Sequence, residues 1–234
     1  MNQYLWTYFN LLFVLLALVT SPAPEQSCSG RQSGIEDPPE KGQQSFRENN
    51  SPVDLGNKVA DYVLAQPMGP FYTHSCAHHG ILMFAEATQN NRLRDCVVAA
   101  YAPYRSGEKE PATGHVDHNL FGIIPLEIYR LTGDTVCLAQ GKALADEEWD
   151  NPRPDGLTRY TRWWLDDVYM VGCLQSHAYQ ATHDPKYARR GTEFLLAYVA
   201  KLQQPDGLMH HGPQQPYYWV RGNGWAAAGM TEML

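Results

Sequence analysis

Two neighbouring acids stand in an aromatic, apolar stretch of the chain. Residues 163–170 read Trp-Trp-Leu-Asp-Asp-Val-Tyr-Met, which places the acids at Asp166 and Asp167. A buried carboxylate must be paired, hydrogen-bonded or protonated, because desolvating an isolated charge costs far more than a fold can offset. A carboxyl kept protonated by an apolar surrounding is what a general acid requires near neutral pH. If residues 163–182 form one helix, Asp166 shares a face with Trp163 and Tyr169 whereas Asp167 shares one with Trp164, and periodicity does not choose between the two acids.

A third acid and a downstream aromatic segment complete the set that could act on a sugar. Asp117 stands at the start of another predicted helix, where an Asp is ordinarily a cap. Residues 219–225 read Trp-Val-Arg-Gly-Asn-Gly-Trp. An aromatic ring stacks on the apolar face of a pyranose, and an Arg pairs with a uronate carboxylate as a fork. Trp219, Arg221 and Trp225 suit both tasks, although a structural turn with core tryptophans is the alternative.

One pair of histidines has the spacing of metal ligands, but the rest of a metal-binding motif is absent from the sequence. His74 and His78 stand four residues apart, a spacing that places two ligands on one helix face, and His79 follows directly. The sequence shows no matching carboxylate or second histidine pair at ligand spacing, so we predict no metal. His210 and His211 precede a glycine in a predicted loop, where one of them could donate a hydrogen bond to substrate.

The elements that must position these residues are predicted to be helices. Apolar residues recur at intervals of three and four, and alternating runs typical of strands are absent, so the class is all-α. The predicted helices are 54–66, 75–88, 91–104, 117–132, 135–149, 163–182, 185–203 and 221–234. Three helix junctions look alike, with a Thr at positions 88, 132 and 182 followed two residues later by Asn or Asp. A recurrence after about 45 residues is typical of one helical hairpin per repeat.

Hydrophobicity alternates along these hairpins. The helices predicted at 117–132 and 163–182 are apolar almost all round, whereas those at 135–149 and 185–203 are amphipathic. This alternation favours two concentric rings of helices, because an open solenoid leaves a wet face on every helix. Pro125 should kink its helix or mark its true start.

A closed double ring of this kind needs about six hairpins, and the chain supplies about four. Its last residues predict a helix without a C-terminal signal. We therefore expect the chain to be a C-terminally truncated part of a longer protein.

Composition bounds the location and the partners. The 234 residues carry a formal net charge of −7 and no cluster of Lys or Arg, which argues against a nucleic-acid partner. Residues 1–23 contain an apolar run with a small-residue end, which predicts a signal peptide and hence secretion or a periplasmic location, with an uncleaved membrane anchor as the alternative. Residues 24–53 predict a disordered linker. Residues 54–234 then form the folded domain.

The cysteines do not suggest a disulfide framework. Cys76, Cys96, Cys137 and Cys173 stand singly in apolar, helix-like segments. We therefore interpret them as buried hydrophobic residues.

Taken together, these motifs resemble the unsaturated rhamnogalacturonyl hydrolases of glycoside hydrolase family 105 and the related unsaturated glucuronyl hydrolases of family 88. The resemblance covers about residues 55–234 and depends on the order of the motifs. These are Asp117 heading an inner helix, the Trp-Leu-Asp-Asp run at 164–167, a His-Gly at 211–212, and the segment at 219–225. It implies an (α/α)6 barrel.

The resemblance also implies a reaction. That family removes a 4,5-unsaturated uronic acid from the non-reducing end of lyase-generated oligosaccharides by hydrating the vinyl ether. It implies Asp166 as proton donor and activator of water, and Asp117 as its partner acid. It places the substrate-binding residues of the cleft at Trp164, His211, Trp219, Arg221 and Trp225. No metal and no organic cofactor are implied, and the implied partner is an unsaturated oligosaccharide.

Two other functions remain open. An inverting (α/α)6 glycosidase would use Asp117 and Asp166 as acid and base, with carboxyl groups about 6.5–9.5 Å apart. A non-catalytic helical-repeat protein would bind a sugar or a protein without turnover.

Overall fold

The computed structural model describes residues 51–234. The predicted signal peptide or anchor at 1–23 and nearly all of the predicted linker at 24–53 therefore lie outside the described residues. Within the described part of the chain, no helix is both long and apolar enough to cross a membrane. The first described helix begins at Pro52, slightly before the predicted start of the domain.

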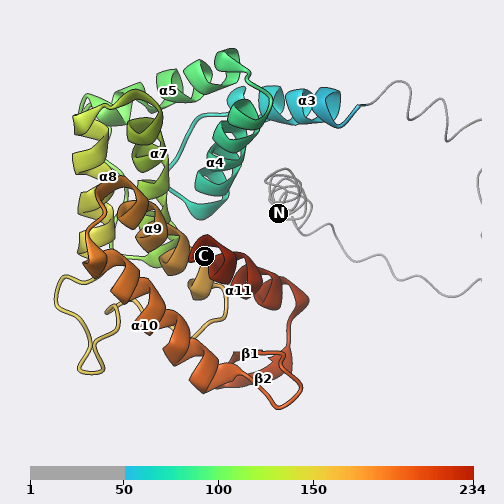
Figure 1. Ribbon diagram of the computed structural model, residues 1–234, viewed down its shortest axis with the longest axis vertical. Helices are drawn as coiled ribbons and strands as arrows, with labels where there is room; N and C mark the ends of the chain where they lie inside the picture. The colour runs from blue at the N-terminus through green and yellow to red at the C-terminus, as the bar shows by residue number, and fades with distance from the viewer. Residues whose placement is uncertain (1–50) are drawn as a thin grey trace, which may run out of the picture.

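The described chain is mostly helical, and its helices lie close to the predicted segments (Figure 1). They are α3 (Pro52–Leu64), α4 (Tyr72–Ala87), α5 (Asn91–Arg105), α6 (Val116–Asn119), η1 (Leu120–Gly122), α7 (Ile123–Thr132), α8 (Thr135–Glu147), α9 (Asp167–Thr182), α10 (Pro185–Leu202) and α11 (Val220–Glu232). The prediction of a chain without strands is wrong. Strands β1 (His210–Gly212) and β2 (Gln215–Tyr218) pair antiparallel as a short hairpin between α10 and α11.

The three predicted helix junctions share one geometry. In each, a Thr hydroxyl donates to the carbonyl four residues earlier, the next residue adopts a left-handed conformation, and an Asn or Asp side chain caps the following helix. The junctions are Thr88-Gln89-Asn90, Thr132-Gly133-Asp134 and Thr182-His183-Asp184. Because each cap satisfies a backbone N–H that the helix itself leaves unbonded, the motif ends one helix and starts the next within three residues.

The helices form two layers, as the alternation in hydrophobicity predicted. Helices α4, α7, α9 and α11 make an inner layer in which each packs against the next, and α5, α8 and α10 lie outside them (Figure 1). Helix α9 is buried without interruption from Asp167 to Ala178, whereas α10 buries one side chain in every three or four. The inner helices therefore carry the core, and the outer helices shield it.

The predicted helix at 117–132 is divided into α6, the 3₁₀ turn η1 and α7. Pro125 is the third residue of α7, where its missing N–H costs no intrahelical hydrogen bond. It thus marks the start of the regular inner helix, which was one of its two predicted roles.

The contact between α9 and α11 depends on a glycine. A Cβ added at Gly229 would lie 2.5 Å from the carbonyl oxygen of Val168, and Gly172 faces the same crossing. No side chain fits between two backbones at that separation. Gly229 therefore lets α11 lie directly on α9.

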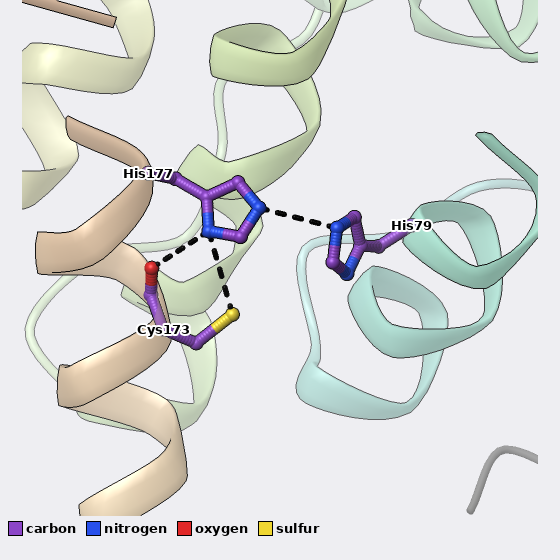
Figure 2. Close-up of side chains that lie close together, drawn as sticks. All are labelled: His79, Cys173 and His177. Atoms are coloured by element: carbon purple, nitrogen blue, oxygen red, sulfur yellow. Dashed lines mark hydrogen bonds between the residues drawn. The ribbon is translucent and has the colours of Figure 1, made fainter. Parts of the chain in front are cut away.

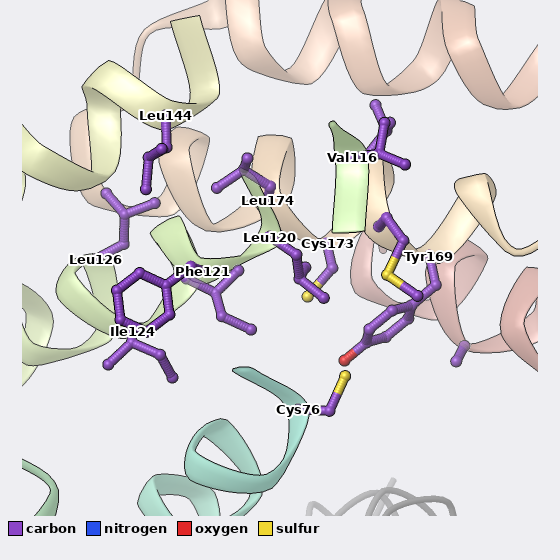
Figure 3. Close-up of a cluster of buried hydrophobic side chains, with 14 of the residues drawn as sticks. Cys76, Val116, Leu120, Phe121, Ile124, Leu126, Leu144, Tyr169, Cys173 and Leu174 are labelled. Atoms are coloured by element: carbon purple, nitrogen blue, oxygen red, sulfur yellow. The ribbon is translucent and has the colours of Figure 1, made fainter. Parts of the chain in front are cut away.

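The core lies between the inner helices and contains three of the cysteines. Cys76 and Cys173 are buried among apolar side chains (Figure 3), Cys137 is also buried in the core, and Cys96 is half-buried. The interpretation of these cysteines as hydrophobic core residues is confirmed for the three that are buried.

Candidate active site

Asp166 stands at the entrance to α9 and not within it. The helix begins at Asp167, so the predicted helix start at residue 163 is wrong. Trp163 adopts a left-handed backbone conformation with φ of 62°, and its N–H donates to the Tyr198 hydroxyl at 3.0 Å. Asp166 occupies the N-cap position, where its side chain accepts no capping hydrogen bond within residues 51–234. Its carboxylate is therefore available for other contacts at the positive end of the helix dipole.

Two polar side chains face the Asp166 carboxylate. His211 Nδ1 lies 3.5 Å from Oδ2, and an Arg221 guanidinium nitrogen lies 3.5 Å from Oδ1. Oδ2 of Asp166 and Nδ1 of His211 are both buried, and neither makes a hydrogen bond with any residue of 51–234. Buried polar atoms without partners are rare in folded proteins, and they occur where a ligand or water completes the bonding. Asp166 and His211 are therefore a candidate site for binding a ligand.

Asp167, the adjacent acid, has a different environment. It is fully buried, and it accepts hydrogen bonds from the Arg162 backbone N–H (3.1 Å), from Arg162 Nε (2.8 Å) and from the Tyr198 hydroxyl (2.7 Å). Burial raises the pKa of Asp167, and the guanidinium of Arg162 opposes that rise. All of these contacts hold the loop before α9 onto α9 and α10, so the structure gives Asp167 an anchoring role.

Asp117 is linked to the same arginine. It lies in the first turn of α6, and its two carboxylate oxygens accept from the Arg162 guanidinium at 3.1 and 3.3 Å. Arg162 thus bridges Asp117 and Asp167, and its guanidinium lies 5.0 Å from the ring centre of Trp164. Sequence reasoning missed Arg162, although it stands directly before the paired tryptophans and is the cation nearest in sequence to Asp166 and Asp167. The structure brings Asp117 and Asp166 into one region through this bridge.

Aromatic rings surround His211. Its ring centre lies 5.0 Å from that of Trp219, 5.8 Å from Trp164 and 6.0 Å from Tyr217. The Arg221 guanidinium lies over the Trp219 ring at 4.7 Å. Trp164 and Trp219 remain about two-fifths exposed, so their faces can contact a ligand. His211 itself is buried on β1, in a strand where sequence reasoning expected a loop.

Trp225 and Tyr72 contact each other close to Asp117 and Asp166. Trp225 is buried on α11, with its ring centre 4.8 Å from Tyr169 and 6.1 Å from Tyr72. The pKa of Tyr72 is raised by burial and further by the charges of Asp117 and Asp166, while Arg221 opposes the rise. Tyr72 therefore lies within electrostatic reach of both acids. Sequence reasoning missed it because a tyrosine at the start of a helix gives no signal by itself.

The Gly-Asn pair after Arg221 explains how the hairpin and α11 are joined. The side-chain amide of Asn223 bonds to both the N–H and the carbonyl of Met209, each at 2.9 Å. A Cβ at Gly222 would approach His211 Nδ1 to 3.4 Å, so a glycine there leaves room for the imidazole. The backbone N–H of Leu165 also donates to the His211 carbonyl at 2.9 Å. These contacts fix His211 against the loop that carries Asp166.

The two spaced histidines on α4 are joined by a hydrogen bond to the backbone. His78 Nδ1 donates to the His74 carbonyl oxygen at 2.8 Å. His79, beside them, points to a different partner, His177 on α9. Among residues 51–234, the group with metal-ligand spacing is His79, Cys173 and His177, which lies apart from the residues described above.

Known proteins are similar to this chain in sequence and in fold. Residues 48–234 match the sequence model of Glycosyl Hydrolase Family 88, and no curated protein sequence matches the chain. Several solved structures are similar, among them the following three. A polysaccharide lyase shares 20% identity with a TM-score of 0.64, and the match covers 77% of this chain and 58% of the lyase. A glycosyl hydrolase family 88 protein from Bacteroides vulgatus shares 16% identity with a TM-score of 0.64, covering 78% and 61% of the two chains. A family 105 glycoside hydrolase from C. acetobutylicum ATCC 824 shares 16% identity with a TM-score of 0.68, covering 79% and 59%.

The chain thus spans 58–61% of the length of these structures. At such identities the likeness shows the fold, and it confirms the predicted helical barrel architecture of inner and outer helices. The family model extends from residue 48 to the last residue and includes every acid and aromatic residue described above. The chain belongs to glycosyl hydrolase family 88.

Proposed function

We propose that this protein removes a 4,5-unsaturated uronic acid, of the galacturonyl type, from the non-reducing end of oligosaccharides that polysaccharide lyases generate. Oligosaccharides of this kind are products of the degradation of pectin-type polymers. The predicted export signal in residues 1–23 would bring the enzyme to such oligosaccharides outside the cytoplasm. Membership of glycosyl hydrolase family 88 supports the reaction class.

One observation carries the proposal: Oδ2 of Asp166 and Nδ1 of His211 face each other at 3.5 Å, and both atoms are buried and lack a hydrogen-bond partner within residues 51–234. A carboxyl group so placed can exchange a proton with a bound substrate. Asp167 is unsuited to the task, because its oxygens are already occupied by Arg162 and Tyr198. The structure therefore supports Asp166 over Asp167, the choice that periodicity left open.

The surroundings of Asp166 suit an unsaturated uronate. Arg221 is the cation beside Asp166, and its planar guanidinium matches a sugar carboxylate as a bidentate partner. Trp164 and Trp219 offer exposed ring faces for stacking on the planar C4=C5 region of the sugar. Asp117, held by Arg162, is positioned as the second acid that contacts the sugar.

The proposed chemistry is acid-initiated hydration of a vinyl ether. Protonated Asp166 gives its proton to C4, and the electron pair of the double bond forms the new C–H bond. The positive charge develops at C5 and on the ring oxygen. Asp166, now a carboxylate, accepts a proton from water as the water oxygen bonds to C5. The resulting hemiketal opens by breaking its bond to the ring oxygen, and the hemiacetal left at C1 then releases the remaining sugar.

The test follows the ultraviolet absorbance of an unsaturated galacturonyl-rhamnose disaccharide with the full natural chain. Hydration destroys the conjugated double bond, so absorbance should fall with the native protein and remain constant with the Asp166→Asn variant. The matched control is Asp184→Asn, because Asp184 caps α10 and Asn caps a helix equally well. This control should retain activity.

Other outcomes would assign another function. Release of the rhamnose with the absorbance retained would indicate an ordinary glycosidase that uses Asp117 and Asp166 as acid and base. New absorbance from a saturated uronan would indicate β-elimination. Binding without turnover, unchanged by Asp166→Asn, would indicate a non-catalytic sugar-binding protein. Each of these results would refute the vinyl-ether reaction.

A further inference from the structure

A second polar cluster lies within the core, between α4, α7 and α9. It consists of His79, Cys173 and His177, whose potential ligand atoms all lie within 4.8 Å of one another (Figure 2). The three side chains are buried, with 5%, 0% and 4% of their surface exposed. His177 stands about 16 Å along α9 from Asp166, given a rise of about 1.5 Å per residue. The cluster therefore has no part in the proposed active site.

The hydrogen bonds orient the imidazoles as metal ligands are usually oriented. His177 Nδ1 lies 2.9 Å from the carbonyl oxygen of Cys173, so Nδ1 carries a proton and donates it. In a neutral imidazole this leaves a lone pair on Nε2. Metal-ligating histidines commonly donate their other ring N–H to a backbone carbonyl in this way, which fixes the tautomer. The Nε2 of His177 then faces the Nε2 of His79.

The separations match tetrahedral coordination. The two Nε2 atoms are 3.2 Å apart, and Oε1 of Glu127 on α7 lies 3.5 Å from the Nε2 of His177. Two nitrogens that each lie about 2.0–2.1 Å from a tetrahedral zinc ion are roughly 3.3–3.4 Å apart. Cys173 Sγ lies 3.7 Å from Nδ1 of His177 and within 4.8 Å of a ring nitrogen of His79, close to the roughly 3.6 Å expected between a thiolate and a nitrogen on one zinc ion. Cys173 and His177 share one face of α9, four residues apart.

The local charges favour a cation. The carboxylate of Glu127 accepts a hydrogen bond from Arg130 at 2.9 Å. Arg130 also pairs with Glu86, so the positive charge of Arg130 is shared between two carboxylates. Glu232 at the end of α11 lies close enough to interact electrostatically with both His177 and Glu127. A divalent ion bound to the Cys173 thiolate beside the Glu127 carboxylate would leave little net buried charge, which limits the cost of burial.

We infer that His79, Cys173 and His177 form a structural site for a tetrahedral divalent transition metal, with zinc as the best match. Two imidazoles and one thiolate are ligands that zinc accepts, whereas calcium and magnesium require oxygen. The ion would join α4 to α9 about 16 Å from Asp166. The inference does not depend on the proposed function.

The test uses the full natural chain, freed of any affinity tag and of bound metal. Titration with Co²⁺ should give stoichiometric binding and a thiolate-to-cobalt charge-transfer band, because cobalt adopts the tetrahedral geometry of zinc sites. Zn²⁺ should displace Co²⁺ and raise the unfolding temperature of the protein. Cys173→Ser should abolish the charge-transfer band. His79→Gln should weaken Co²⁺ binding by more than about 100-fold, since even an outer-shell substitution costs about 10–100-fold.

The controls replace neighbouring residues of the same types. Cys76→Ser removes a buried thiol on α4, and His78→Gln removes the histidine next to His79; neither residue belongs to the group with ligand spacing. Both variants should keep the band and the affinity. A native protein that is folded but gives no charge-transfer band would overturn the inference and leave a plain hydrogen bond between His79 and His177. A band that Cys76→Ser removes equally would place the ion elsewhere and overturn it too.

Discussion

Replacing Arg162 by methionine should destabilise this protein much more than the loss of a surface arginine does. The guanidinium holds Asp117 and Asp167, and Asp167 is fully buried. Breaking a buried ion pair by removing one partner typically costs about 3–5 kcal/mol, because the other charge stays buried. Asp167 would still accept from Tyr198 and from a backbone N–H, so the lower end applies, about 3 kcal/mol. For a domain of this size that corresponds to a fall of roughly 6–12 °C in the unfolding temperature.

The loss should depend on pH in a defined direction. Burial already raises the folded-state pKa of Asp167, and Arg162 limits that rise. Removing Arg162 therefore raises the pKa further. A group with a raised folded-state pKa stabilises the fold fully below its unfolded pKa and loses that contribution as pH rises through the folded value. The difference between Arg162→Met and the native protein should thus be small at about pH 4 and should grow toward about pH 8.

The assay is denaturant unfolding at both pH values, with Arg92→Met as the control. Arg92 pairs with Asp61 on the surface, where both side chains are more than half exposed, so its replacement should leave the midpoint almost unchanged. Adding Asp167→Asn to Arg162→Met should recover part of the loss, because it removes the stranded charge. An Arg162→Met effect no larger than the control, or one that is the same at both pH values, would refute this account of the Asp167 environment.

Three further predictions concern the junctions, the helix crossing and the cleft. A side chain with a Cβ is strained at positive φ, and both His183 and Gly133 have positive φ. Replacing His183 by glycine should therefore stabilise the protein by about 1 kcal/mol, and Gly133→Ala should destabilise it by a similar amount. Equal effects of the same sign in denaturant unfolding would contradict this. Gly229→Ala should cost about 1–3 kcal/mol, because its Cβ would lie 2.5 Å from the Val168 carbonyl oxygen, and an unchanged unfolding temperature would show that α11 does not pack so closely. Tyr72→Phe removes one hydroxyl group near Asp117 and Asp166, so it should lower kcat/KM in the vinyl-ether assay by about 3–10-fold at constant stability. Full activity of this variant would exclude that hydroxyl group from the reaction.

The helices could be predicted from sequence because their signals are local. A Thr followed by an Asn or Asp two residues later needs only its own neighbours to end one helix and cap the next, and the structure shows this at all three predicted junctions. The apolar character of α9 likewise reflects burial on every side. Pattern and structure agree where the residues that decide the conformation are within a few positions of one another.

The errors occur where distant contacts decide the conformation. The paired tryptophans fit a helical pattern, but the buried contacts of Arg162 and Tyr198 hold the chain before Asp167 in a loop, and Trp163 adopts a positive φ there. The hairpin at 210–218 was missed because its strands are only three and four residues long, too short to show alternation. Asn223 pins that hairpin to α11 through the backbone of residue 209, a contact across 14 residues that no periodicity reveals.

Adjacent positions 166 and 167 show how one short sequence can yield two different acids. Successive residues at a helix start point about 100° apart, so Asp167 is directed into the core while Asp166 is directed toward His211 and Arg221. The core-facing Asp167 accepts hydrogen bonds from Arg162, so its carboxylate oxygens are not available to a substrate. Because the same guanidinium also holds Asp117, the Asp167–Arg162 pair helps to fix Asp117 as well as the helix end that presents Asp166. A substitution at Asp167 should therefore impair catalysis without touching substrate, and loss of activity there is no evidence that Asp167 is the proton donor.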